Sequence, residues 1–439
     1  MRKLLDPRPG ARRGPGSAPD DASGLATMPT TELLDGLAAA PGATLALLIA
    51  SSGRLRTRLR STAPDRIAPW WRRLADAQRA ALERDEPALV GGLGGIPYAV
   101  RSRANSRVLR AAMLITGRHP IDEAALRAAA LTELRRAADE ETLVSLDLEV
   151  PVRATVAVGD LDRATHVSYL VPGMDVGVAG SIGDYVGAAH RLRQTQAAVS
   201  DVPLADIAVV AWLGYRPPHN ASVEGMVSVA FNERAAVGAV ALASDLRALR
   251  ASRCGSPPEI TVVGHSYGTN VAALALTRTS AAHAVLLGSA GIAATVRRAA
   301  DIDVPIGEVF ATEAVADEWA MVGRALSLRP DPTTVRFGAR VFSSEGGTVN
   351  GLDVEAVGMH GPFGDRPGRV SYLDAGSSAL LSTALVAMGR GGELPARGGP
   401  NDRMIQFSRR IARRFVLPAD EGRPRPASPS VSSRDAGRP

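Results

Sequence analysis

The 439-residue sequence has a single cysteine, a single lysine and no long apolar run. Cys254 on its own excludes an internal disulfide and a thiolate metal cluster. Because Lys3 is the only lysine, the many arginines indicate a coding bias, and a lone arginine is weak grounds for a binding site. The apolar stretch 43–50 is far shorter than the roughly 18 residues of a membrane-spanning helix. An N terminus rich in charge and proline differs from a secretory signal peptide, which predicts a cytoplasmic protein.

The positive charge of the sequence is concentrated at its two ends. The formal net charge is +6 at pH 7. Residues 1–21 carry five cations against three carboxylates, and residues 402–439 carry nine arginines against four carboxylates. The body between them is therefore close to neutral, which predicts no nucleic-acid-binding face.

Strand-like and helix-like segments alternate along residues 141–395. Short β-branched runs stand at wide spacing with helical periodicity between them, which predicts a mostly parallel sheet covered by helices on both faces. Residues 28–140 have helical periodicity and predict a helical N-terminal extension. The predicted strands are 143–150, 153–158, 166–171, 207–212, 260–263, 284–287 and 307–311, with a weaker one at 354–357. The predicted helices among them are 179–199, 233–252, 267–279, 315–326 and 378–389.

Both ends of the chain differ in composition from this body. Residues 1–27 and 418–439 are rich in proline and arginine, which predicts disordered tails. Residues 396–417 are expected to form a basic amphipathic helix. Its stretch 404–416, which alternates apolar residues with arginines, fits packing on the domain, which we favour, or weak contact with a membrane surface.

The strongest motif is 264–268, with the sequence G-H-S-Y-G, which matches the G-x-S-x-G nucleophile elbow. A β-branched strand precedes the motif and an Ala/Leu-rich helix follows it. Such a sharp strand-to-helix turn exposes the serine hydroxyl, and the flanking glycines keep Cβ atoms out of the crowded turn. The motif therefore predicts Ser266 as a nucleophile, the alternative being a glycine-rich turn that only joins strand to helix.

Two backbone N–H groups are candidates to stabilise the oxyanion that forms when Ser266 attacks a carbonyl. The N–H of Tyr267 lies at the positive N terminus of the following helix. The N–H of Met174 follows an earlier strand, where the second donor is expected. Gly173 and Tyr215, at the ends of two predicted strands, are candidate substrate-binding residues. The Tyr215 and Tyr267 side chains fit an acyl pocket or core packing equally well.

A serine nucleophile needs a base and an acid, which follow it in the order Ser, acid, His. His360 is the only histidine well downstream of Ser266, on a glycine-rich loop, and is the predicted base. Asp317 lies shortly after the strand 307–311 and is the predicted acid, with Glu313 as the alternative. The non-catalytic alternative for His360 is an exposed loop histidine. For Asp317 it is an acidic residue that stabilises the N terminus of the following helix. His265, inside the motif, is expected to pack in the core.

Several short segments follow one another in a specific order between residues 65 and 390. They are 94–97 (GGIP), 103–105 (RAN), 166–174 (HVSYLVPGM), 211–215 (AWLGY), 264–268 (GHSYG) and 286–291 (LLGSAG). This combination resembles an actinobacterial family of α/β-hydrolases of uncharacterised function. The resemblance implies an α/β-hydrolase fold with a helical N-terminal extension, Ser266 as nucleophile and Asp317 as acid.

The position of the histidine departs from the pattern of this family. Members place it about three residues before a Tyr-Leu-like pair; here the pair is Tyr372-Leu373 and Arg369 stands at that position. Either His360 serves through a longer loop or the triad is incomplete. We expect a serine hydrolase that cleaves an ester-like bond of a small acyl or lipid-like substrate, with no metal or organic cofactor. An acyltransferase and a non-catalytic binding protein on the same scaffold are the alternatives.

Overall fold

The computed structural model describes residues 22–114, 121–218, 232–253, 255–320, 329–349, 351–365 and 368–395. The predicted C-terminal helix 396–417, its stretch 404–416 and the tail 418–439 lie outside these residues. Cys254 and part of the predicted helix 315–326 also lie outside them.

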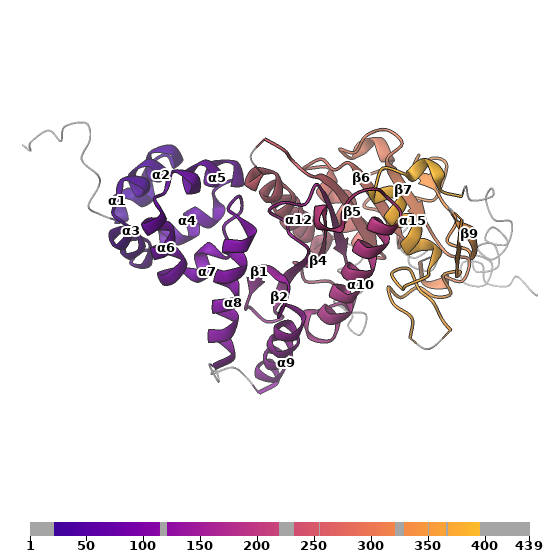
Figure 1. The fold of residues 1–439 in the computed structure, drawn as a ribbon, viewed down its shortest axis with the longest axis horizontal. Helices are drawn as coiled ribbons and strands as arrows, with labels where there is room; N and C mark the ends of the chain where they lie inside the picture. The colour runs from indigo at the N-terminus through magenta and orange to yellow at the C-terminus, as the bar shows by residue number, and fades with distance from the viewer. Residues whose placement is uncertain are drawn as a thin grey trace, which may run out of the picture. The chain divides into compact units, whose positions relative to one another are not determined.

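Helices α1 to α9 form the N-terminal part of the fold (Figure 1). Apolar side chains of α1 to α8 meet in a core of their own, which includes Leu37, Trp70 and Ile96. Helix α1 lies in the segment that the sequence predicted to be disordered, and Leu25, 1% exposed in this core, gives that helix an apolar anchor. The helices are α1 (Ala22–Thr27), α2 (Thr30–Ala39), α3 (Gly42–Ala50), α4 (Gly53–Ser61), α5 (Pro64–Arg73), α6 (Asp76–Asp85), α7 (Pro87–Val90), α8 (Tyr98–Leu114) and α9 (Ile121–Ala137).

In the described part of the chain, an eight-stranded sheet follows with the strand order β1-β2-β4-β3-β5-β6-β7-β8. Strands β1 and β2 pair antiparallel, as do β2 and β4, and every other neighbouring pair is parallel. The strands are β1 (Thr142–Asp147), β2 (Arg153–Val158), β3 (His166–Val171), β4 (Ile207–Leu213), β5 (Glu259–His265), β6 (His283–Leu287), β7 (Val309–Thr312) and β8 (Arg340–Val341). The prediction of a mostly parallel sheet is confirmed.

Helices cover both faces of this sheet. Alternate residues of β4 point to opposite sides: Val209 and Ala211 join one core with α10 (Val178–Ala198) and α15 (Ser378–Ala387). Val210 and Trp212 join a second core, which includes residues of two further described helices. Because both faces of the sheet are covered at its centre, the central strand β4 is buried and apolar along its whole length instead of alternating. The helices of the second face are α12 (Glu233–Ser252) and α13 (Gly268–Leu276), and three short 3-10 helices complete the list: η1 (Leu204–Asp206), η2 (Ala299–Asp301) and η3 (Gly391–Glu393).

The weak strand predicted at 354–357 is not part of this sheet, and that prediction is wrong. The two-residue strand β8 occupies the edge beside β7 instead. Residues Leu352–Val354 form β10, which pairs with β9 (Gly347–Val349) in a separate two-stranded ribbon. Since β8 contains one arginine and one valine, it is too short and too polar to show a strand pattern in the sequence.

Side-chain hydrogen bonds tie the helical extension to the sheet domain. Asn105 of α8 donates through Nδ2 to the carbonyl oxygens of Leu143 and Val144 in β1, at 3.0 and 3.2 Å. At the N terminus of α8, the carboxylate of Asp162 accepts the backbone N–H of Tyr98 at 2.8 Å. A carboxylate at a helix N terminus satisfies free N–H groups and stabilises the helix dipole. The GGIP and RAN segments thus flank the junction between the two parts.

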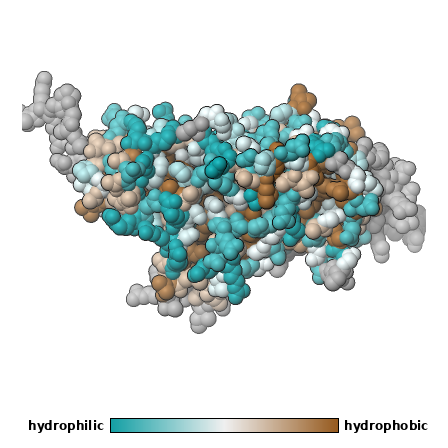
Figure 2. Space-filling model, viewed as in Figure 1, coloured by the Kyte–Doolittle hydropathy of each residue, from teal (hydrophilic) through white to brown (hydrophobic). Residues whose placement is uncertain are grey.

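The visible surface is mostly hydrophilic, with apolar residues in scattered groups (Figure 2). Across the described ranges, no helix combines the length and the apolar character needed to cross a membrane. The same residues contain no cluster of three or more histidine, cysteine, aspartate or glutamate side chains that could hold a metal ion.

Candidate active site

The motif 264–268 forms the sharp turn between β5 and α13. Ser266 adopts a positive φ of 53°, and its N–H donates to the carbonyl oxygen of Leu287 at 2.9 Å. A Cβ at Gly264 would lie 2.7 Å from Thr269 Cα, and a Cβ at Gly268 would lie 2.5 Å from the carbonyl oxygen of Pro172. Glycine is therefore required on both sides of the serine, which stands in a strained conformation at the carboxyl end of a central strand.

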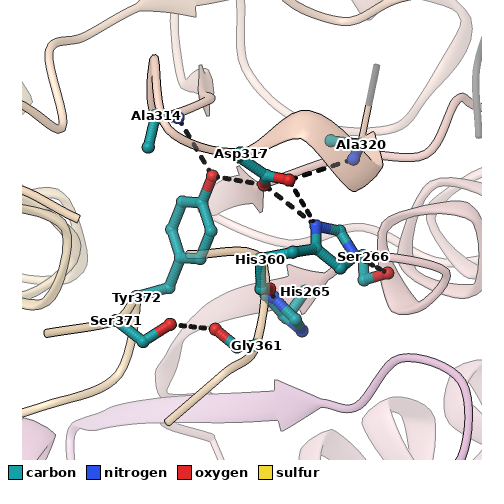
Figure 3. Close-up of polar contacts among 9 residues, drawn as sticks. All are labelled: His265, Ser266, Ala314, Asp317, Ala320, His360, Gly361, Ser371 and Tyr372. Atoms are coloured by element: carbon teal, nitrogen blue, oxygen red, sulfur yellow. Dashed lines mark hydrogen bonds and ion pairs between the residues drawn. The ribbon is translucent and has the colours of Figure 1, made fainter. Parts of the chain in front are cut away.

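Ser266, His360 and Asp317 come from distant parts of the sequence and form one hydrogen-bonded chain (Figure 3). Ser266 Oγ lies 2.8 Å from His360 Nε2. His360 Nδ1 lies 2.7 and 2.9 Å from the two carboxylate oxygens of Asp317. The structure thus brings together the three residues that the sequence analysis singled out, and it favours Asp317 over Glu313 as the partner of the histidine.

The carboxylate of Asp317 is buried and receives further hydrogen bonds. Burial alone would raise its pKa, but the hydrogen bond and charge of His360, with the donors Ala320 N–H and Tyr372 O–H, hold the pKa below its usual value. These two donors lie 3.0 and 2.7 Å from the carboxylate oxygens. Asp317 is therefore ionised at neutral pH and can stabilise a positive charge on His360. Tyr372 belongs to no motif in the sequence that predicts this contact.

His360 reaches Ser266 through the glycine-rich loop, whereas Arg369 points elsewhere. The guanidinium of Arg369 is 44% exposed and lies 3.7 Å from Asp365. The loop is held close behind His360: the N–H of Leu373 donates to Pro362 O at 2.9 Å. Of the two alternatives left open by the sequence, the geometry favours delivery of the histidine by a longer loop.

His265 also holds this loop, from inside the motif. Its Nε2 lies 2.8 Å from the carbonyl oxygen of His360. Because a carbonyl only accepts, Nε2 must carry the proton. Burial, reinforced by the nearby His360, lowers the pKa of His265 to about 3. His265 is 3% exposed, as the prediction of a packed histidine implies, and it also serves as a neutral donor that fixes the backbone of the base.

This buried histidine predicts a loss of stability in mild acid. In the unfolded chain His265 binds a proton below its ordinary pKa of 6.5, whereas the folded protein resists protonation until about pH 3. Its contribution to the free energy of unfolding is therefore present above pH 6.5 and falls toward pH 3, by about 1.4 kcal/mol per pH unit for one proton. Urea unfolding of the wild type and His265→Gln at pH 7, 6 and 5 measures this. The variant should have the shallower dependence on pH, and equal slopes would contradict the assignment.

The turn 172–174 lies against the nucleophile. A Cβ at Gly173 would stand 2.8 Å from Ser266 Cβ and 3.3 Å from Ser266 Oγ, so only glycine leaves the hydroxyl undisturbed. Met174 is the next residue, and its N–H belongs to the same turn. The turn after β3 is thus beside Ser266, which is where the second oxyanion donor was expected, and Gly173 adjoins the reacting atom.

The two tyrosines considered for an acyl pocket are buried instead. Tyr215 is 5% exposed, and its hydroxyl donates to the carbonyl oxygen of Pro172 at 2.7 Å. Its ring stacks on Trp212, with centroids 5.8 Å apart. Tyr267 is 1% exposed, and its hydroxyl accepts the N–H of Ala235 at 3.2 Å. Of the two readings left open for Tyr215, its burial favours core packing, and its hydroxyl supports the turn that carries Gly173.

The sequence from β1 to just beyond Asp317 matches a known family. Residues 147–327 match the family described as alpha/beta hydrolase. The chain has the α/β-hydrolase fold. The matched residues include the elbow of the α/β-hydrolase domain and the acid loop, and they end before His360.

The expected resemblance to uncharacterised actinobacterial proteins is confirmed by two mycobacterial relatives. The uncharacterized protein Rv2079 of Mycobacterium tuberculosis is 29% identical over 395 residues, which cover 77% of this chain and 57% of the relative. The uncharacterized protein Rv0963c of the same organism is 34% identical over 174 residues, which cover 38% of this chain and 63% of the relative. The chain therefore spans little more than half the length of the first relative.

Solved structures with partial likeness include two hydrolases. The esterase PE8 has a TM-score of 0.32 and 18% sequence identity, and the match covers 46% of this chain and 89% of the esterase. A dienelactone hydrolase from Anabaena variabilis has a TM-score of 0.31 and 14% identity, and the match covers 59% of this chain and 99% of that enzyme. The family match and the strand order, not these likenesses, establish the fold.

Proposed function

We propose that this protein is a serine hydrolase that cleaves an ester-like acyl bond through an acyl-enzyme on Ser266. The observation that carries the proposal is the hydrogen-bonded chain from Ser266 through His360 to Asp317, with donor–acceptor distances of 2.7 to 2.9 Å. A nucleophile beside a base that is itself oriented by a buried carboxylate is the arrangement that nucleophilic catalysis requires. The strained turn that presents Ser266 supports the same role.

The proposed reaction has two halves. His360 Nε2 takes the proton of Ser266 as Oγ attacks the carbonyl carbon of the ester, and the carbonyl oxygen becomes an oxyanion. The N–H groups of Tyr267 and Met174 are the proposed donors to this oxyanion. Collapse of the intermediate breaks the ester bond, and His360 returns the proton to the departing alcohol. A water molecule then attacks the acyl-enzyme, with His360 again as base, and releases the acid. Asp317 stabilises the charged imidazole in both halves.

The substrate class is proposed from charge. The sequence outside the charged ends is close to neutral. A neutral small acyl or lipid-like ester therefore fits the site better than a nucleic acid.

A fluorophosphonate probe tests the proposed nucleophile directly. The folded protein should form a stable adduct, and peptide mass spectrometry should locate it on the peptide that contains Ser266. Heat-unfolded protein is the control, because the reaction needs the assembled chain of hydrogen bonds. A parallel panel of p-nitrophenyl esters of increasing acyl length measures turnover. An adduct on another residue, or ester turnover without any adduct, would overturn the proposal.

A further inference from the structure

We infer that Tyr372 is a positioning residue of the proposed hydrolase, which clamps the loop of Asp317 to the loop of His360. The inference rests on the proposed function of these two residues. Tyr372 is fully buried, and its hydroxyl is bonded on both sides (Figure 3). It donates to Asp317 Oδ2 at 2.7 Å and accepts the backbone N–H of Ala314 at 3.0 Å. A hydroxyl has one proton to donate, and here that proton is directed to the carboxylate.

Hydrogen bonds on both oxygens fix the orientation of this carboxylate. Oδ1 receives the N–H of Ala320 and Oδ2 receives the hydroxyl of Tyr372, and each oxygen also contacts His360 Nδ1. Rotation of the carboxylate would break at least one of these bonds inside a buried site, where an unsatisfied group is costly. Gly288, directly after β6, leaves space for Asp317 and Tyr372. A Cβ at this position would lie 2.8 Å from Asp317 Oδ2 and 3.0 Å from the Tyr372 ring.

The residues on either side of Tyr372 hold the loop that carries His360, Gly361 and Pro362, called here the base loop. Ser371 Oγ donates to the carbonyl oxygen of Gly361, and the N–H of Leu373 donates to that of Pro362. Gly361 and Pro362 directly follow His360 in the sequence. Three consecutive residues therefore bind the base loop, the acid and the base loop again. The family resemblance would place the histidine at position 369, just before this segment, and here the segment fixes His360, which lies nine residues upstream of that position.

The clamp has a consequence that a packing role would lack. Tyr372 is one of the donors that keep the pKa of Asp317 low in spite of burial. Without its O–H, the ionised carboxylate loses a charge-assisted hydrogen bond, and the pKa of Asp317 must rise. Asp317 can stabilise a charged His360 only while it is ionised, that is, above its pKa. Without the Tyr372 hydroxyl, activity should therefore be lost at a higher pH than in the wild type as the solution is acidified. Loss of packing alone would lower stability and leave the pH profile in place.

Tyr372→Phe tests the clamp because it removes the hydroxyl and keeps the ring. With p-nitrophenyl acetate we expect kcat/KM to fall about tenfold at pH 7, mainly through kcat, as loss of a hydrogen bond to a charged group implies. The acid limb of the profile should move upward by about half a pH unit or more. The matched control is Tyr98→Phe, which removes an equally buried hydroxyl in α8 and should leave the profile unchanged. A Tyr372→Phe enzyme with an unaltered profile and kcat/KM within about twofold would overturn the inference.

A readout without turnover separates this inference from the proposed function. NMR of protein labelled with 13C at the aspartate carboxyls gives this readout. The Asp317 resonance is assigned as the one that is missing from the spectrum of Asp317→Asn. Its titration midpoint should be higher in Tyr372→Phe than in the wild type. If this midpoint moves while the wild type forms no fluorophosphonate adduct and turns over no ester, the clamp contact stands and the hydrolase proposal fails. If esters are hydrolysed and neither the midpoint nor the profile moves, the clamp fails and the hydrolase proposal stands.

Discussion

Ser266→Ala is expected to abolish labelling by fluorophosphonates and to lower kcat for ester hydrolysis by about 10⁴-fold or more, since the nucleophile itself is removed. Stability should change little. The hydroxyl is small, and alanine takes over the same backbone strain at a φ of 53°. Labelling intensity and initial rates on p-nitrophenyl esters measure the effect, and circular dichroism checks that the fold is retained.

Ser382→Ala is the matched control for this substitution. Ser382 is also buried, in α15, and among the described residues its hydroxyl has no hydrogen-bond partner. Its loss should leave labelling and turnover at the wild-type level. If Ser266→Ala were labelled at the wild-type rate, another residue would be the nucleophile. Equal losses in both variants would point to a general loss of folding instead of the loss of one group.

The central sheet and the elbow were predictable because their physical signals are local. Strands buried on both faces are mostly apolar, and β3 was predicted with its observed boundaries, 166–171. The elbow needs glycine on both sides of the serine, which leaves a fixed pattern over five residues. Ser266 and its turn could therefore be located from sequence spacing alone.

The remaining features depend on contacts between segments that are distant in the sequence. Tyr372 touches Asp317 across 55 residues, and His265 touches the His360 backbone across 95. Such hydrogen bonds leave no periodicity, so neither role could be predicted. Tyr215 was placed in a pocket because it ends a strand at the ligand edge of the sheet. The sequence could not reveal that its hydroxyl is engaged by Pro172.

His360→Ala is expected to lower kcat about 10⁴-fold, because the hydroxyl of Ser266 loses the base that accepts its proton. Arg369→Ala should stay within about twofold of the wild type, because the ion pair of this half-exposed arginine with Asp365 is a surface contact, which contributes little. Added imidazole should restore part of the rate of His360→Ala, since the removed ring leaves space beside Ser266. Rates with and without imidazole, measured on the same ester, check all three expectations.

The opposite pattern would reassign the base. A large loss in Arg369→Ala with near-normal turnover in His360→Ala would place the functional residue where the family resemblance expects a histidine, and the longer loop would then be structural. Wild-type folding of His360→Ala is expected because the side chain is 21% exposed and its backbone carbonyl, which His265 holds, is retained. A lost rate in a folded His360→Ala therefore reports on proton transfer, and this distinguishes a complete triad on a displaced loop from an inactive α/β-hydrolase scaffold.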